Sequence, residues 1–205
     1  MSTAALWGGI VLIALALCGV GLGWRLRRLL AHPSRPDRAP PRGAAWRGIL
    51  YAFTWGMMPW AKESTRRHFL PYVRGVLFHI GIFATFASLI VSPWRHALPS
   101  TLAHVGLGLT LMGTLGGLIG VLMRILDERL RALSHPDDYA AVVLVTAWQA
   151  AGAAFWADPG ALPFFYGLSA LTLVAIPLTK IRHCLYFFFS RFFFGRFYGR
   201  RAVLG

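Results

Sequence analysis

Acidic residues are scarce in this sequence: 7 Asp and Glu stand against 21 Lys and Arg in 205 residues, a formal net charge of +14. Charged residues make up 14% of the chain and hydrophobic residues 57%, whereas a soluble domain has about 25% charged residues. The polar surface on which a nucleic-acid-binding protein displays its basic residues is therefore missing. The composition excludes a soluble single domain, indicates a membrane protein and gives no reason to expect a nucleic-acid partner.

Cysteine is also scarce, because the chain has only Cys18 and Cys184, near its opposite ends. Two such residues exclude a disulfide scaffold and a cysteine-rich metal site. The long apolar stretches contain no acidic residue, which disfavours a small transporter. The first stretch is not preceded by basic residues or followed by a small-residue cleavage site, so we expect a retained membrane span rather than a signal peptide.

Five uncharged windows are long enough to cross a bilayer, which needs roughly 20 apolar residues in a helix. They cover about residues 4–24, 75–94, 101–123, 139–157 and 162–179, and the last helix is expected to continue to residue 189. The sequence therefore predicts an all-α integral membrane protein. Its expected architecture is a five-transmembrane-helix bundle forming a single membrane domain over residues 1–205, with a cytoplasmic tail at 190–205.

The hydrophilic segment at residues 25–70 separates the first two spans. Its part at 32–42 (HPSRPDRAPPR) is predicted to be a linker rich in Pro and Arg. Residues 44–60 (AAWRGILYAFTWGMMPW) are apolar and aromatic but too short to cross a bilayer. They predict an interfacial amphipathic helix between the first and second spans; the alternative is a loop packed on the bundle.

The basic residues predict the orientation of the chain, because short loops rich in Lys and Arg stay on the cytoplasmic side. All of them except Arg95 fall before span two or at its start, after span three or after span five. We therefore expect a multi-pass protein of a bacterial or archaeal cytoplasmic membrane, with its N-terminus outside and its C-terminus in the cytoplasm.

Two histidines are the main candidates for chemistry. His79 lies inside an apolar span, where an ionisable residue indicates function, and His183 lies late in the expected fifth helix. At 1.5 Å per residue, both are expected at similar depth on the cytoplasmic side. Two imidazoles from facing helices at one depth are what a b-type haem with two axial histidines requires. Gly75 and Gly81 flank His79 and would let a flat macrocycle approach the helix.

Cations are expected near such a haem because its propionates are anionic. Arg74, Lys180 and Arg182 fall at a suitable level along the chain. The two remaining polar candidates, Glu63 and His68, stand at the cytoplasmic entry of span two. They form either a solvated face or a site that accepts protons from a quinol.

His104 begins span three and is expected at a different depth from His79. Its surroundings, HVGLGLTLMGTLGGLIG, form a small-residue face for close helix packing, so a packing role is the simplest interpretation. His32, His96 and His135 lie in predicted loops and are interpreted as solvated residues.

The motif LFHIGIF at residues 77–83 and the run IPLTKIRHCLYFFFSRFFFGRF at 176–197 carry a resemblance to a known family. Together with KESTRRH at 62–68, they resemble the cytochrome b gamma subunit of respiratory nitrate reductase and related subunits of heterodisulfide-reductase-like and sulfite-reduction-associated membrane complexes. The similarity covers spans two to five. It implies b haem held by five helices, electrons from a membrane quinol, and an iron–sulfur partner subunit on the cytoplasmic side.

By that resemblance, His79 and His183 match the two ligands of the haem nearer the cytoplasmic partner. The positions that correspond to the ligands of the family's second, outer haem are occupied by Leu89 and Phe165, which cannot ligate iron. We therefore expect one haem b, with a second haem at His104 as an open alternative. The same departure puts the outer quinone site in doubt and favours quinone exchange near Glu63 and His68.

The expected function is electron relay between the quinone pool and a cytoplasmic iron–sulfur oxidoreductase, with no substrate-reducing site in this chain. The basic inner side and the aromatic C-terminal tail FFFSRFFFGRFYGRR are expected to contact anionic lipid and the partner. The competing interpretation is a haem-free membrane anchor or assembly subunit of a respiratory complex, in which the histidines only pack.

Overall fold

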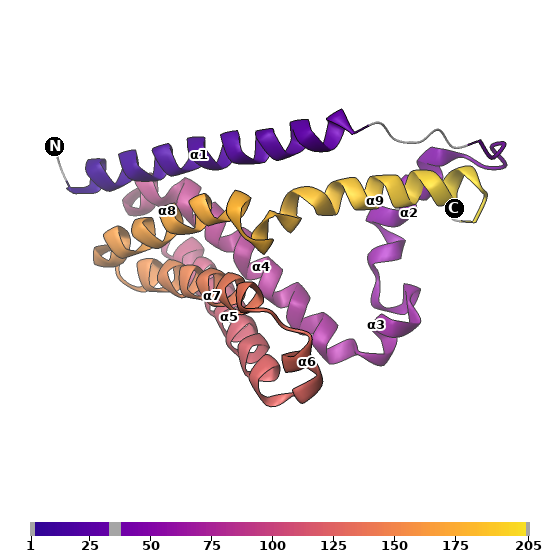
Figure 1. Cartoon of the computed structure of the whole chain (residues 1–205). Coiled ribbons are helices and arrows are strands. Elements are labelled where there is room, and N and C mark those ends of the chain that lie inside the picture. The colour runs from indigo at the N-terminus through magenta and orange to yellow at the C-terminus, as the bar shows by residue number, and fades with distance from the viewer. Residues whose placement is uncertain (1–2, 33–37, 204–205) are drawn as a thin grey trace. The chain divides into compact units, whose positions relative to one another are not determined.

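The computed structural model describes residues 3–32 and 38–203, and it is helical throughout those ranges, with no strand (Figure 1). Five helices are long and apolar enough to cross a membrane. They are α1 (Thr3–Ala31), α4 (Phe69–Val91), α5 (Ser100–Leu126), α7 (Pro136–Ala157) and α8 (Leu162–Leu178). The predicted all-α fold with five apolar spans is confirmed. Part of the predicted linker, residues 33–37, lies outside the described residues.

The ends of the middle spans follow from prolines and caps. After α4, a 3-10 turn (Ser92–Ala97) with Pro93 in its first turn leads to Pro99, which precedes α5. Helix α7 begins at Pro136, where the absent N–H is no loss. The Asp138 carboxylate accepts the backbone N–H of His135 at 2.9 Å. The connection between α4 and α5 is therefore a short helical turn next to proline.

The fifth span ends earlier than predicted. Helix α8 stops at Leu178, a 3-10 turn covers Lys180–Arg182, and a new helix, α9 (His183–Arg200), follows. Pro177 lacks an N–H and crowds the preceding turn. Thr179 is extended, and its hydroxyl donates to the Ala175 carbonyl at 2.9 Å and accepts the Ile181 N–H at 3.2 Å. The expected continuous helix to residue 189 is wrong, and most of the expected tail at 190–205 is helical.

The predicted interfacial helix is shorter than residues 44–60. Helix α2 (Ala45–Phe53) ends at Thr54, whose φ of −121° and ψ of −96° are not helical. Two 3-10 turns, Trp55–Met57 and Pro59–Ala61, and the short helix α3 (Glu63–Arg67) follow. Its placement in a membrane interface stays a prediction.

The contacts of the chain divide it into two compact units. Unit 1 comprises residues 1–21 and 73–181, and unit 2 comprises residues 22–72 and 182–205. Unit 1 therefore holds α4, α5, α7 and α8, whereas unit 2 holds α2, α3 and α9.

The core of unit 1 lies between α5, α7 and α8. Helix α7 packs along α5 and against α8, and Figure 1 shows α5 and α7 side by side. Phe155 and Phe165 stack with ring centroids 5.3 Å apart. Trp148 Nε1 donates to the Ser169 hydroxyl at 2.8 Å. Aromatic packing and paired hydroxyls thus join the spans, as expected where the lipid offers no hydrogen-bond partners.

Helix α4 approaches α5 closely at one pair of glycines. A Cβ added at Gly81 would overlap the Cα of Gly113 and the side-chain oxygen of Gln149, and a Cβ at Gly113 would overlap the same oxygen. Farther along α4 toward its C-terminal end, the Ser88 hydroxyl accepts a hydrogen bond from Trp156 Nε1 at 2.7 Å, which joins α7 to α4. Only glycine permits this crossing, because any larger residue meets backbone.

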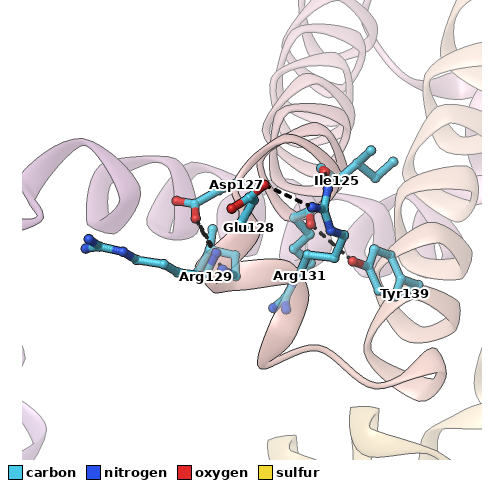
Figure 2. Close-up of polar contacts among 8 residues, drawn as sticks. Ile125, Asp127, Glu128, Arg129, Arg131 and Tyr139 are labelled. Carbon is cyan, nitrogen blue, oxygen red and sulfur yellow. Dashed lines mark hydrogen bonds and ion pairs between the residues drawn. The ribbon is translucent and has the colours of Figure 1, made fainter.

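The connection between α5 and α7 contains the short helix α6 (Glu128–Ala132) and is closed by polar contacts (Figure 2). The Asp127 carboxylate caps α6 by accepting the Arg129 backbone N–H at 2.9 Å. Arg131 donates to the Ile125 carbonyl at 2.9 Å and lies 3.7 Å from the Glu128 carboxylate. Tyr139 donates to the Arg124 carbonyl at 3.1 Å. The bonds from Arg131 and Tyr139 thus satisfy two carbonyls that the end of α5 leaves unpaired.

Unit 2 is built on the pairing of α2 with α9, which lie side by side in Figure 1. A Cβ at Gly48 would lie 2.5 Å from the Cα of Gly199, and a Cβ at Gly195 would lie 2.6 Å from the Gly48 carbonyl oxygen. Gly195 and Gly199 are one helical turn apart, so they form a continuous glycine stripe. The backbone N–H of Gly43 also donates to the Arg200 carbonyl at 3.0 Å.

Candidate functional site

His79 lies on α4 with its side chain exposed on the surface of unit 1. Its Nδ1 is 2.7 Å from the carbonyl oxygen of Gly75. Because a carbonyl only accepts, Nδ1 is the donor in this bond, and in a neutral ring the lone pair is then on Nε2. Iron- and zinc-ligating histidines are commonly oriented by such a bond from their other nitrogen. The Phe78 ring also stands edge-on to the imidazole, at 5.9 Å between centroids.

The two glycines expected to admit a macrocycle behave differently. Gly75, one turn before His79, has no atom within 4 Å of the place where a Cβ would stand. It therefore fits the expected close approach of a flat group on the His79 face. Gly81 is buried against Gly113 and Gln149, so it serves the crossing of α4 with α5. The expected role of Gly81 beside a haem has no support in its surroundings.

The cations expected near haem propionates have protein partners. The Arg74 guanidinium donates to the Gly116 carbonyl at 3.2 Å and covers Gly120 on α5. Lys180 Nζ lies 2.8 Å from the Asp138 carboxylate. Arg182 closes the 3-10 turn before α9 and belongs to unit 2. In the structure, Arg74 and Lys180 thus join helices of unit 1, and any propionate contact would be additional to these bonds.

His183 is the first residue of α9, is exposed and belongs to unit 2, whereas His79 belongs to unit 1. The depth expected for His183 assumed an unbroken helix from residue 162. Since α8 ends at Leu178, that arithmetic is wrong: the span itself is about 25 Å long at 1.5 Å per residue, and His183 follows it after a turn. The pairing of the two imidazoles stays a prediction.

The residues expected to exchange protons with a quinol lie on and beside α3 in unit 2. Glu63 opens α3 and forms an exposed ion pair with Arg67, 2.5 Å between the charged atoms. His68 follows the helix as its C-cap, with its backbone N–H donating to the Ser64 carbonyl at 3.1 Å. Next to them, partial burial and then the charge of Arg191 lower the pKa of Lys62. The Glu63 carboxylate and the His68 imidazole are both exposed to solvent. The carboxylate forms its ion pair with Arg67.

The two positions that would serve an outer haem are packed differently. Phe165 is fully buried and stacks on Phe155, so its place is part of the core of unit 1. Leu89 is partly buried on α4. Within residues 3–32 and 38–203, no group of three His, Cys, Asp or Glu residues lies close enough to hold a metal ion. A haem needs no such group, because the protein supplies only two ligands to its iron.

Two features of unit 1 were missed from the sequence. His104 is exposed and, with Arg95 and Trp156, lines a cavity, although its sequence surroundings indicated only packing. Gln149 is fully buried, and neither its amide nitrogen nor its oxygen has a hydrogen-bond partner among the described residues. One signal was available for each: Arg95 is the only Lys or Arg between the second and third predicted spans, and Gln149 is a lone amide within an apolar span.

Comparison with known protein families found no matching family, and comparisons with curated proteins and with solved structures found no match either.

Proposed function

We propose that this chain is a membrane cytochrome b subunit that binds one b-type haem and relays electrons between membrane quinone and a cytoplasmic iron–sulfur oxidoreductase. Five apolar helices provide the membrane setting. The haem would supply a one-electron carrier, and the chain would hold its iron through His79 and His183. The proposal includes no substrate-reducing site within the chain.

The observation that carries this proposal is the state of His79. Its Nδ1–H is held by the Gly75 carbonyl, one turn earlier on the same helix. The ring therefore cannot rotate without losing that bond, and Nε2 is the nitrogen that can donate a lone pair. Gly75 leaves open space on the same face of α4. An imidazole fixed by its own helix beside an uncovered glycine supports axial ligation better than a packing role.

The second ligand is assigned to His183, which opens α9 on an exposed position. Quinone exchange is assigned to Glu63 and His68, since both are exposed and each carries a group that accepts protons. The distribution of basic residues supports an outside N-terminus and a cytoplasmic C-terminus.

Haem content of the purified protein tests the proposal. Wild-type chain, isolated in mild detergent with whatever copurifies, is expected to give one b-type haem per chain in a pyridine haemochrome assay. His79→Ala and His183→Ala are each expected to remove the reduced-minus-oxidised b-haem spectrum, because a six-coordinate haem loses an axial ligand. His96→Ala is the matched control: it removes an exposed histidine from the turn after α4 and should keep the full spectrum.

Three results would contradict this assignment. Absence of b-type haem from the wild-type protein would leave the membrane anchor or assembly subunit as the function. Two haems per chain would overturn the single-haem version, especially if His104→Ala reduced the count to one. A spectrum retained in both His79→Ala and His183→Ala would show that other side chains hold the iron.

A further inference from the structure

A cavity of about 370 Å³ in unit 1 is separate from the residues of the proposed haem site. It lies where the 3-10 turn Ser92–Ala97 meets the first turns of α5 and the end of α7. Its polar lining comes from Arg95, Ser100 and His104, beside the ring of Trp156. A cavity at the ends of apolar spans lies where headgroups meet hydrocarbon.

Arg95 is held in place by Trp156. Its Nη2 donates to the Trp156 carbonyl at 3.2 Å, and the guanidinium lies 5.2 Å from the centroid of the Trp156 ring. Its Nε is buried and has no hydrogen-bond partner in the described part of the chain. Arg95 also lines the cavity, and a guanidinium has five N–H donors, so an acceptor bound in the cavity can pair with donors that the Trp156 carbonyl does not use.

No carboxylate of the described residues forms an ion pair with Arg95. The three ion pairs found among them do not include Arg95. Asp158, which follows the α7 end of the cavity, accepts the backbone N–H of Gly160 at 2.8 Å and caps the next turn. His104 and Ser100 add further N–H and O–H groups to the same lining. The cavity therefore offers a fixed cation and several donors to an oxyanion.

The rest of the lining is apolar and comes from Leu98, Ala103 and Leu107. Guanidinium groups bind phosphate through charge-assisted hydrogen bonds, and an apolar wall suits the glycerol and first methylenes of a lipid. We propose that this cavity binds the phosphate oxyanion of a phospholipid headgroup, with Arg95 as its principal contact and His104 as a second donor. The site does not depend on the proposed haem or on electron transfer.

Native mass spectrometry of the full chain in mild detergent tests the site. The delipidated wild-type protein is offered dioleoyl phosphatidylglycerol, dioleoylglycerol, which has the same chains without phosphate, or inorganic phosphate. One phosphatidylglycerol per chain is expected to bind about tenfold more tightly than dioleoylglycerol. Arg95→Gln should remove that preference, and His104→Ala should reduce it. Arg129→Gln, which removes an exposed arginine from α6, is the matched control and should keep it.

The three ligands distinguish a lipid phosphate from free phosphate, and they also show whether the cavity binds an oxyanion at all. Displacement of the lipid by millimolar inorganic phosphate would keep the oxyanion site and assign it to free phosphate. Equal binding of phosphatidylglycerol and dioleoylglycerol to the wild type would overturn the site, whatever the folding of Arg95→Gln. Unchanged preference in both Arg95→Gln and His104→Ala would overturn the residue assignment.

Discussion

The two units of this chain join their helices by different means. In unit 1, long apolar spans meet through buried aromatic rings and hydroxyls, such as Trp148 with Ser169 and Trp156 with Ser88. In unit 2, helices α2 and α9 meet backbone to backbone along Gly48, Gly195 and Gly199. Phe53 of α2 also packs against Phe187 and Phe188 of α9, with ring centroids 6.3 Å apart, whereas many other aromatic rings of these two helices are exposed.

The two units therefore depend on different features of the sequence. A span of unit 1 is specified by average hydropathy over about 20 residues, and its side chains then supply specific bonds. The pairing in unit 2 depends on single positions, because one Cβ at the glycine stripe would collide with backbone that cannot move aside. Hydropathy is thus tolerant of substitution, whereas the glycine contact is not, and the predictions below test that contrast.

The largest effect is expected for Gly48→Leu in unit 2. Its side chain would collide with the Gly195 carbonyl and the Gly199 backbone, and overpacking of this kind costs about 3 kcal/mol. Separation of α2 from α9 should let α9 unfold locally, so trypsin should cut at the arginines of α9 about tenfold faster or more. The rate is measured on the purified chain in detergent.

Gly23→Leu is the control for that substitution. It makes the same change in the same unit at a glycine with no atom within 4 Å of its Cβ position. Trypsin cleavage of α9 in Gly23→Leu should match the wild type. Equal cleavage rates in Gly48→Leu and Gly23→Leu would mean that the glycine stripe does not hold unit 2 together.

A smaller effect is expected for Gly81→Ala in unit 1. One added methyl overlaps Gly113 and the amide oxygen of Gln149, which should lower the free energy of unfolding by about 1–3 kcal/mol. The Gln149 side chain has no hydrogen bond to lose within the described residues. The double variant Gly81→Ala, Gln149→Ala should therefore regain part of the loss, with a coupling energy of about 1 kcal/mol. Denaturant unfolding in detergent measures all three variants.

Gly108→Ala on α5 serves as the reference for the glycine change alone. Its Cβ position is open, and alanine is a better helix former than glycine. Its stability should equal or exceed that of the wild type. Strict additivity of Gly81→Ala and Gln149→Ala would show that the two side chains do not meet.

The smallest effect concerns the thiol of Cys184 on α9. Cys184 is exposed at the surface, but partial desolvation of its thiol raises its pKa above the ordinary value, and two backbone hydrogen bonds oppose the shift more weakly. A raised pKa means less thiolate at any given pH, so alkylation should be slower between pH 7 and 9 and should level off at higher pH. The rate with N-ethylmaleimide is measured from pH 7 to 10 in a Cys18→Ser background. The same protein in SDS provides the reference, and coincident pH profiles would contradict desolvation of the thiol.

The sequence predicted much of unit 1 because its spans depend on local composition. The observed bounds of α5 and α7 differ from the predicted windows by a few residues, and the small-residue face predicted on span three contains the buried glycines of α5. The end of span five was missed because apolar residues continue through 185–189. The break there results from Pro177 and the hydrogen bonds of Thr179, which average hydropathy does not register.

The candidate site was predictable only in part. His79 stood out as an ionisable residue in an apolar run, but its bond to Gly75 is a matter of rotamer and became visible only in the structure. Gly75 and Gly81 looked equivalent because both flank His79. They differ because the side of α4 that carries Gly81 packs against α5 and Gln149, whereas Gly75 has open space at its Cβ position.

By itself, the sequence determined that the chain has five helices able to cross a membrane, since the cost of placing charge or unpaired backbone in hydrocarbon leaves few other structures for such windows. Tertiary structure alone decided which glycines lie at helix crossings and that Arg95 and His104 line a common cavity. It also decided that the Gln149 amide is buried with no hydrogen-bond partner among the described residues. Those features depend on which residues of different helices meet, and contacts between distant segments are not encoded in any single window of the chain.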